Sequence, residues 1–178
     1  MKIRWNSILN FLILLVTALF LGAFQTTFWF QLFGGVPGPL LWLNLIVYVT
    51  LYRKPMPAIL TVYAIGFALL TYSAMPLKMI WINSLIIFTL VYVIKTRVFW
   101  SGSGYYTIMC AFSSVAFQVC YFLTSLLLEK NSTNLEFMDR LVQIILTPSF
   151  AFPMYWALSK LDRASDNHLM HEAGGLEV

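Results

Sequence analysis

Acidic residues are absent from every long apolar run of this sequence. All of them lie outside those runs, at Glu129, Glu136, Asp139, Asp162, Asp166, Glu172 and Glu177. No Lys, Arg or His lies deep inside a run either. Proton relays, ion-coupled transporters and intramembrane enzymes usually need an ionisable group at membrane depth. Its absence counts against these three classes, but it does not exclude a carrier of a neutral ligand.

Charge is scarce along the whole chain. Only 10% of the 178 residues are charged and 60% are hydrophobic, whereas an average soluble domain is about 25% charged. The composition therefore predicts an integral membrane protein. A crossing takes roughly 20 residues, so the length allows about six crossings and leaves no room for a sizeable soluble domain.

Motifs for catalysis and for cofactors are also missing. The sequence has no Gly-rich phosphate loop, no nucleophile elbow and no Ser/His/Asp set, so we expect no enzyme, cofactor or metal. Cys110 and Cys120 share one apolar run and are expected to be buried small side chains. The net charge of +4 comes from basic residues at segment ends, which predicts membrane orientation and not nucleic-acid binding.

The apolar runs predict an all-α fold with six transmembrane helices. Their expected ranges are 7–24, 39–52, 56–75, 80–96, 105–128 and 141–159. We expect the first run to be a retained helix and not a cleaved signal peptide, because Leu21 stands where the cleavage site needs a small residue. Pro148 and Pro153 predict a kink or a break in the last helix.

The boundaries and the orientation of this domain follow from the polar residues. One transmembrane domain is expected over 1–163, with a disordered cytoplasmic tail over 164–178, and the polar composition that predicts the tail already begins at Asp162. His168 and His171 in this tail are expected to be solvated. With both termini in the cytoplasm, eight basic residues lie inside and three outside, as the positive-inside rule requires.

Amides and hydroxyls are the polar groups left inside the apolar runs. Asn44 and Asn83 are the two of greatest interest, because an amide in hydrocarbon must find a partner. A ligand site or a contact with a partner helix is one interpretation. Hydrogen bonding between helices of the same bundle, worth roughly 0.6 kcal/mol each, is the more common one.

The stretch from Pro39 to Trp100 resembles the MreD family of rod-shape-determining membrane proteins. The resemblance rests on a short proline-led helix up to Tyr52, the turn Arg53-Lys54-Pro55, the Gly66-containing helix, and Pro76-Leu77 before the next helix. The chain departs from the family at Leu70-Thr71-Tyr72, where an aspartate is common, and at Lys78, where glycine is common. Candidate partner-contact or polar-contact residues are Pro39, Asn44, Arg53, Lys54 and Asn83.

The resemblance implies a function without catalysis. The protein would be a scaffold of the bacterial elongation machinery in the cytoplasmic (inner) membrane, surrounded by membrane lipids. Its partners would be MreC, the actin-like MreB, and the RodA glycosyltransferase with its penicillin-binding protein.

The family is similar in architecture to the substrate-binding components of energy-coupling-factor vitamin importers, which is the alternative. A polar, aromatic-lined outer pocket would favour it, and Phe28, Trp29, Trp81 and Asn83 are the residues expected to line that pocket.

Overall fold

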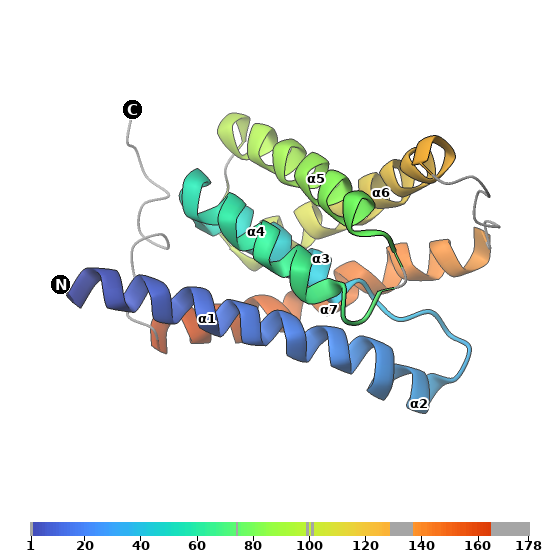
Figure 1. Ribbon diagram of the computed structural model, residues 1–178, viewed down its shortest axis with the longest axis horizontal. Helices are drawn as coiled ribbons and strands as arrows, with labels where there is room; N and C mark the ends of the chain where they lie inside the picture. Colours follow the sequence, from blue (N-terminus) through green and yellow to red (C-terminus); the bar gives the residue numbers. More distant parts are fainter. Residues whose placement is uncertain (1, 74, 99, 101, 129–136, 165–178) are drawn as a thin grey trace.

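The computed structural model describes residues 2–73, 75–98, 100, 102–128 and 137–164 of the chain. Within these ranges the protein is all-helical and contains no strand. Figure 1 shows the helices packed lengthwise against one another, with the start of the first helix and the end of the last helix on the same side of the bundle. The expected all-α fold is therefore confirmed, while the expected tail after Ala164 lies outside the described residues, together with His168 and His171.

The first helical segment is longer than the sequence predicts. Helix α1 (Lys2–Ala23) continues without a gap through a π-helical turn η1 (Phe24–Phe28) into α2 (Trp29–Phe33). The expected range ends at 24, but the helix stops only at Gly34, which has a φ of 59°. Glycine adopts this left-handed backbone without steric cost, so it is a natural helix end.

Helix α3 (Leu41–Tyr52) is the centre of the bundle. Every residue in it except Trp42 is buried, which is why its sequence is apolar on all sides. The short second helix is confirmed, but it begins at Leu41 and not at Pro39, which lies in the preceding segment. Twelve residues reach about 18 Å, too short for a full crossing, and the surrounding helices enclose it instead.

The remaining helices surround α3. They are α4 (Pro55–Leu69), α5 (Leu77–Arg97), α6 (Ser103–Leu128) and α7 (Phe137–Ala164). They depart most from the expected bounds at the end of α4 and at both ends of α7. The third expected helix ends at Leu69 and not at 75, because turns follow it. The last expected helix is not broken: α7 runs through Pro148 and Pro153 and continues five residues beyond the expected end at 159.

One neighbouring side chain explains how α7 tolerates a proline. Pro148 has no N–H to donate to the carbonyl of Ile144, four residues earlier. The hydroxyl of Ser114 on α6 lies 3.5 Å from that carbonyl oxygen, within reach of a long hydrogen bond. A neighbouring helix thus supplies a donor near the freed carbonyl, as is usual for prolines in membrane helices.

Four stretches are long and apolar enough to cross a membrane, and they make this a multi-pass membrane protein. They are 8–33, Leu77–Arg97, Ser103–Leu128 and Phe137–Arg163. Helices α3 and α4 are shorter apolar helices. Consecutive segments run in opposite directions (Figure 1), so basic residues distant in sequence gather at the end of the bundle where α1 begins and α7 ends. Those whose side chains the structure describes are Arg53, Lys54, Lys95, Arg97, Lys160 and Arg163.

Candidate functional site

A buried carboxylate joins three helices at this basic end. Asp162 of α7 is only 6% exposed. Its oxygens accept hydrogen bonds from the amide of Asn10 on α1 (3.3 Å) and from the hydroxyl of Tyr48 on α3 (2.8 Å), and it forms an ion pair with the guanidinium of Arg53. We call these four residues the Asp162 cluster.

The turn between α3 and α4 is fixed from a second side. The ammonium group of Lys95 on α5 donates to the backbone carbonyls of Thr50 and Arg53, at 3.2 and 3.3 Å. These carbonyls lie at the C-terminal end of α3, where cations are favourable. Lys54 next to them is exposed. The basic turn noted in the sequence therefore contains one inward-facing cation and one outward-facing cation.

The Asp162 cluster connects the first, central and last helices of the described chain. A carboxylate buried alone would be costly, but here a guanidinium compensates its charge and two neutral donors use its remaining lone pairs. Removing one member of such a buried pair typically costs about 3–5 kcal/mol. The arrangement offers no nucleophile beside a general base, so it is suited to holding helices together.

Sequence reasoning missed most of this cluster. Asp162 was counted with the polar composition that predicts the tail, but it lies inside α7 and is buried. A signal was present: Met154, Leu158 and Asp162 follow one another at four-residue intervals, and all three are buried on one face of α7. Asn10 is 3% exposed and occurs in an otherwise apolar run, where an amide needs a partner.

The two asparagines singled out in the sequence are both inside the bundle. Asn44 is fully buried, and its amide donates to the backbone carbonyl of Thr147 on α7 at 2.9 Å. Asn83 is also fully buried and exchanges hydrogen bonds with the hydroxyl of Thr124 on α6, at 3.1 and 3.3 Å. Pro39 is buried just before α3. The five candidate residues thus do not form one site.

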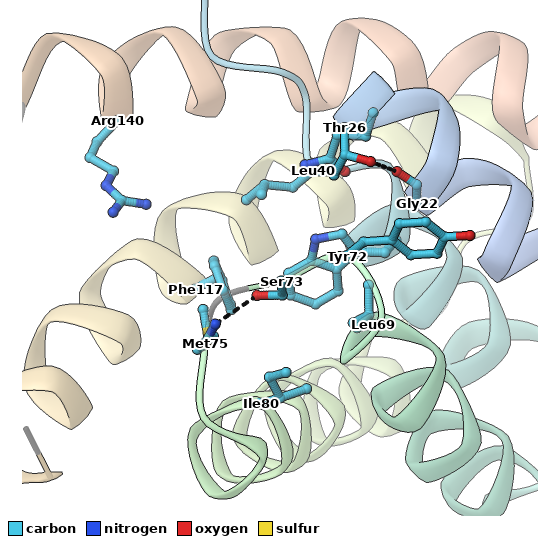
Figure 2. Close-up of a pocket in the computed structure, with 12 residues that line it drawn as sticks. Gly22, Thr26, Leu40, Leu69, Tyr72, Ser73, Met75, Ile80, Phe117 and Arg140 are labelled. Atoms are coloured by element: carbon cyan, nitrogen blue, oxygen red, sulfur yellow. Dashed lines mark hydrogen bonds between the residues drawn. The ribbon is translucent and has the colours of Figure 1, made fainter. Parts of the chain in front are cut away.

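A small pocket lies at the opposite end of the bundle. It has a volume of about 150 Å³ and is lined by parts of every helix from α1 to α7 except α2. Figure 2 shows Tyr72 and Gly22 on one side of it and Arg140, reaching from α7, on the other. We call it the Tyr72 pocket. Its lining residues are Gly22, Gln25, Thr26, Leu40, Trp42, Leu69, Tyr72, Ser73, Met75, Ile80, Phe117 and Arg140.

The aromatic and amide residues expected to line an outer pocket lie elsewhere. Trp29 is buried against Phe33 and Phe150, with ring centroids 4.3 and 5.6 Å away. Trp81 packs on α4 and Asn83 pairs with Thr124. The sequence predicts that four residues line a polar, aromatic-lined pocket. None of Phe28, Trp29, Trp81 and Asn83 lines the Tyr72 pocket.

Arg140 gives the Tyr72 pocket its positive charge. Its guanidinium lies 4.8 Å from the centre of the Tyr121 ring, and it donates long hydrogen bonds of 3.4 and 3.5 Å to the side-chain oxygens of Gln118 and Gln143. These contacts hold the cation without neutralising it. The pocket could therefore accept a small polar or anionic group beside aromatic rings.

Comparisons with known proteins do not extend these findings. No protein-family model, no curated protein and no solved structure matches the chain. What the chain does must therefore be argued from its own helices, its buried polar contacts and its pockets.

Proposed function

We propose that this chain is a non-enzymatic scaffold of the bacterial elongation machinery. In this proposal it is a six-helix protein of the cytoplasmic membrane, with both termini in the cytoplasm. It would help to position MreC, MreB and RodA with its penicillin-binding partner during lateral wall synthesis. The resemblance of residues 39–100 to the MreD family suggests these partners.

The observation that carries the proposal is that polar side chains inside the bundle form hydrogen bonds between its own helices. The side chains of Tyr48, Asn44, Asn83 and Gln118 each bond to another helix of the bundle. The Asp162 cluster additionally ties α1 to α7. Such contacts favour a rigid frame, whose outward apolar faces remain free for partner helices.

The basic end of the bundle supports the orientation. The described basic residues there outnumber the one described acidic residue, Asp162, and the latter is already paired with Arg53. At the opposite end the described charges are Lys78, Asp139 and Arg140. The positive-inside rule assigns the more basic end to the cytoplasm.

The Tyr72 pocket favours the second candidate, a substrate-binding component of an energy-coupling-factor vitamin importer. It is lined by aromatic and polar side chains near the first loop, as that function requires. Its volume of about 150 Å³, however, is below the roughly 300–1,000 Å³ of typical small-molecule sites. We therefore rank this function second.

Co-purification distinguishes the two candidates. The tagged chain, expressed in place of the native copy, would be isolated from native membranes in mild detergent, and its partners identified by mass spectrometry. We expect proteins of the MreC and RodA type, and depletion of the chain should turn rods into spheres. Recovery of a transmembrane coupling subunit with two ATPases, and rods that keep their shape, would instead establish the importer.

A further inference from the structure

A groove runs between α1 and α4 at the basic end of the bundle. It has a volume of about 560 Å³, within the range of sites that hold sizeable ligands. Exposed apolar side chains form its rims: Ile8 of α1 is 54% exposed, and Met56 and Leu60 of α4 are 76% and 66% exposed. Figure 1 shows the two helices approaching each other toward the C-terminal end of α4 and separating toward its start.

The lining of this groove is not purely apolar. Asn10, Arg53 and Thr61 contribute to it. The guanidinium of Arg53 uses Nη2 to bind Asp162, but its Nε–H is buried and has no hydrogen-bond partner among the described residues. A buried donor without an acceptor is costly, and more so when it is charged. Arg53 thus brings an unpaired donor to the groove, and a small rotation of its side chain would present this donor to an incoming oxygen.

The charge around the groove selects the kind of occupant. Lys54, adjacent to Arg53, is exposed, and Lys160 and Arg163 are exposed on α7 close to Asp162 in sequence. Asp162 is the one acidic residue described at this end, and Arg53 already pairs with it. The net charge of the described residues at this end is therefore positive, so an anionic group is favoured where the groove opens beside Lys54.

We propose that the α1–α4 groove binds one anionic phospholipid. A phosphate oxygen accepts the hydrogen bond from Arg53 Nε, Lys54 supplies a second positive charge, and an acyl chain lies along Leu60 and Ile8. Basic pockets between membrane helices suit lipid headgroups for this reason. The apolar rims distinguish a lipid from a soluble phosphate, which would gain nothing from them.

The test measures lipid binding to the purified full-length chain by native mass spectrometry. The protein would be prepared in a neutral detergent and titrated with phosphatidylglycerol, with phosphatidylcholine of the same acyl chains, and with glycerol phosphate. Both lipids carry the phosphate that accepts from Arg53, but the choline cation of phosphatidylcholine would face the positive charge of Lys54. We therefore expect one phosphatidylglycerol to bind about tenfold more tightly than phosphatidylcholine. Glycerol phosphate should not compete at concentrations equal to those of the lipid.

Matched variants test whether the lipid binds in the groove. Arg53→Lys keeps the charge that faces Asp162 but removes the Nε–H, and Lys54→Gln removes the exposed charge; each should weaken phosphatidylglycerol binding severalfold. Lys78→Gln, an exposed lysine at the other end of the bundle, is the control and should change nothing. Leu60→Trp should obstruct the groove, whereas Ile108→Trp on α6, which is also 66% exposed, should not.

Equal binding of both lipids, or equal effects of Lys54→Gln and Lys78→Gln, would overturn the proposal. Displacement by glycerol phosphate would indicate a site for free phosphate. Leu60→Trp changes an exposed residue, so the test remains decisive even if Arg53→Lys does not fold. Loss of a co-purifying protein from the Leu60 variant, without loss of lipid, would assign the groove to a protein partner. The measurement uses purified protein and is independent of the scaffold function.

Discussion

Asp162 and Arg53 form an ion pair across 109 residues of sequence. The pair lies where α3 ends and where α7 approaches its end, so it brings the middle of the chain to its C-terminal part. Tyr48 and Asn10 donate to the same carboxylate. Four residues from three distant parts of the sequence therefore determine how the first, central and last helices meet.

Neutralising this carboxylate should be among the most damaging single changes in the protein. Asp162→Asn leaves the charge of Arg53 buried without compensation, and we expect a loss of about 3–5 kcal/mol in the free energy of unfolding. The measurement is unfolding in mild detergent by denaturant titration. Arg163→Gln changes an exposed neighbour and should stay within about 0.5 kcal/mol of wild type.

A double-mutant cycle shows whether the pair itself is responsible. Arg53→Gln and Asp162→Asn should not be additive, with an interaction energy of about 0.5–3 kcal/mol. Additive losses would mean that the two side chains contribute through separate contacts. In that case the Asp162 cluster would not be the connection between α3 and α7.

The helices could be predicted well where apolar runs end at basic turns. The end of α3 at Tyr52 was correct, because Arg53 terminates the apolar run. The continuation of the first segment to Phe33 was missed. The aromatic residues after Ala23 are as typical of an interface as of a helix, and only packing within the fold decides between them.

The buried ion pair could not be predicted from composition. Asp162 stands beside other polar residues, so it looked like the start of a solvated tail. Its burial depends on Arg53 and Tyr48, which arrive from helix α3 and the turn after it. The four-residue spacing of Met154, Leu158 and Asp162 indicates a buried face of α7, but it does not identify the partners of Asp162, which come from distant parts of the sequence. The same is true of the Tyr72 pocket, whose walls come from six helices and the segments between them.

Removal of the tail should leave the fold and the proposed function intact. A chain that stops after Arg163 retains Asp162 and nearly all of α7, which ends at Ala164. We expect normal cell shape and an unchanged unfolding midpoint, measured by microscopy and by thermal unfolding. Loss of cell shape with normal folding would show that a partner binds the tail.

Close packing at Gly22 should make this position intolerant of a side chain. A methyl group there would lie 2.6 Å from Cδ2 of the Tyr72 ring, so the ring would have to move. We expect Gly22→Ala to destabilise the protein by about 1–3 kcal/mol, as overpacking does. Gly35→Ala is the control, because nothing lies within 4 Å of the added atom. Equal effects of the two substitutions would contradict the packing between α1 and the turn after α4.

The pair of Asn83 and Thr124 tests whether the interior amides serve the bundle or a ligand. Asn83 is fully buried and its amide bonds to Thr124 on the next helix. If the contact is structural, Asn83→Ala and Thr124→Val should each reduce stability slightly, with a coupling of about 0.6 kcal/mol in the double-mutant cycle.

Cell shape and partner recovery should then follow stability and should change little in these variants. Loss of function from Asn83→Ala at unchanged stability would instead mean that the amide recognises a bound molecule. Thr124→Val separates the two explanations, because it removes the hydroxyl that pairs with Asn83 and leaves the amide itself in place. A structural contact predicts that both variants behave alike, whereas a ligand site predicts that only Asn83→Ala loses function.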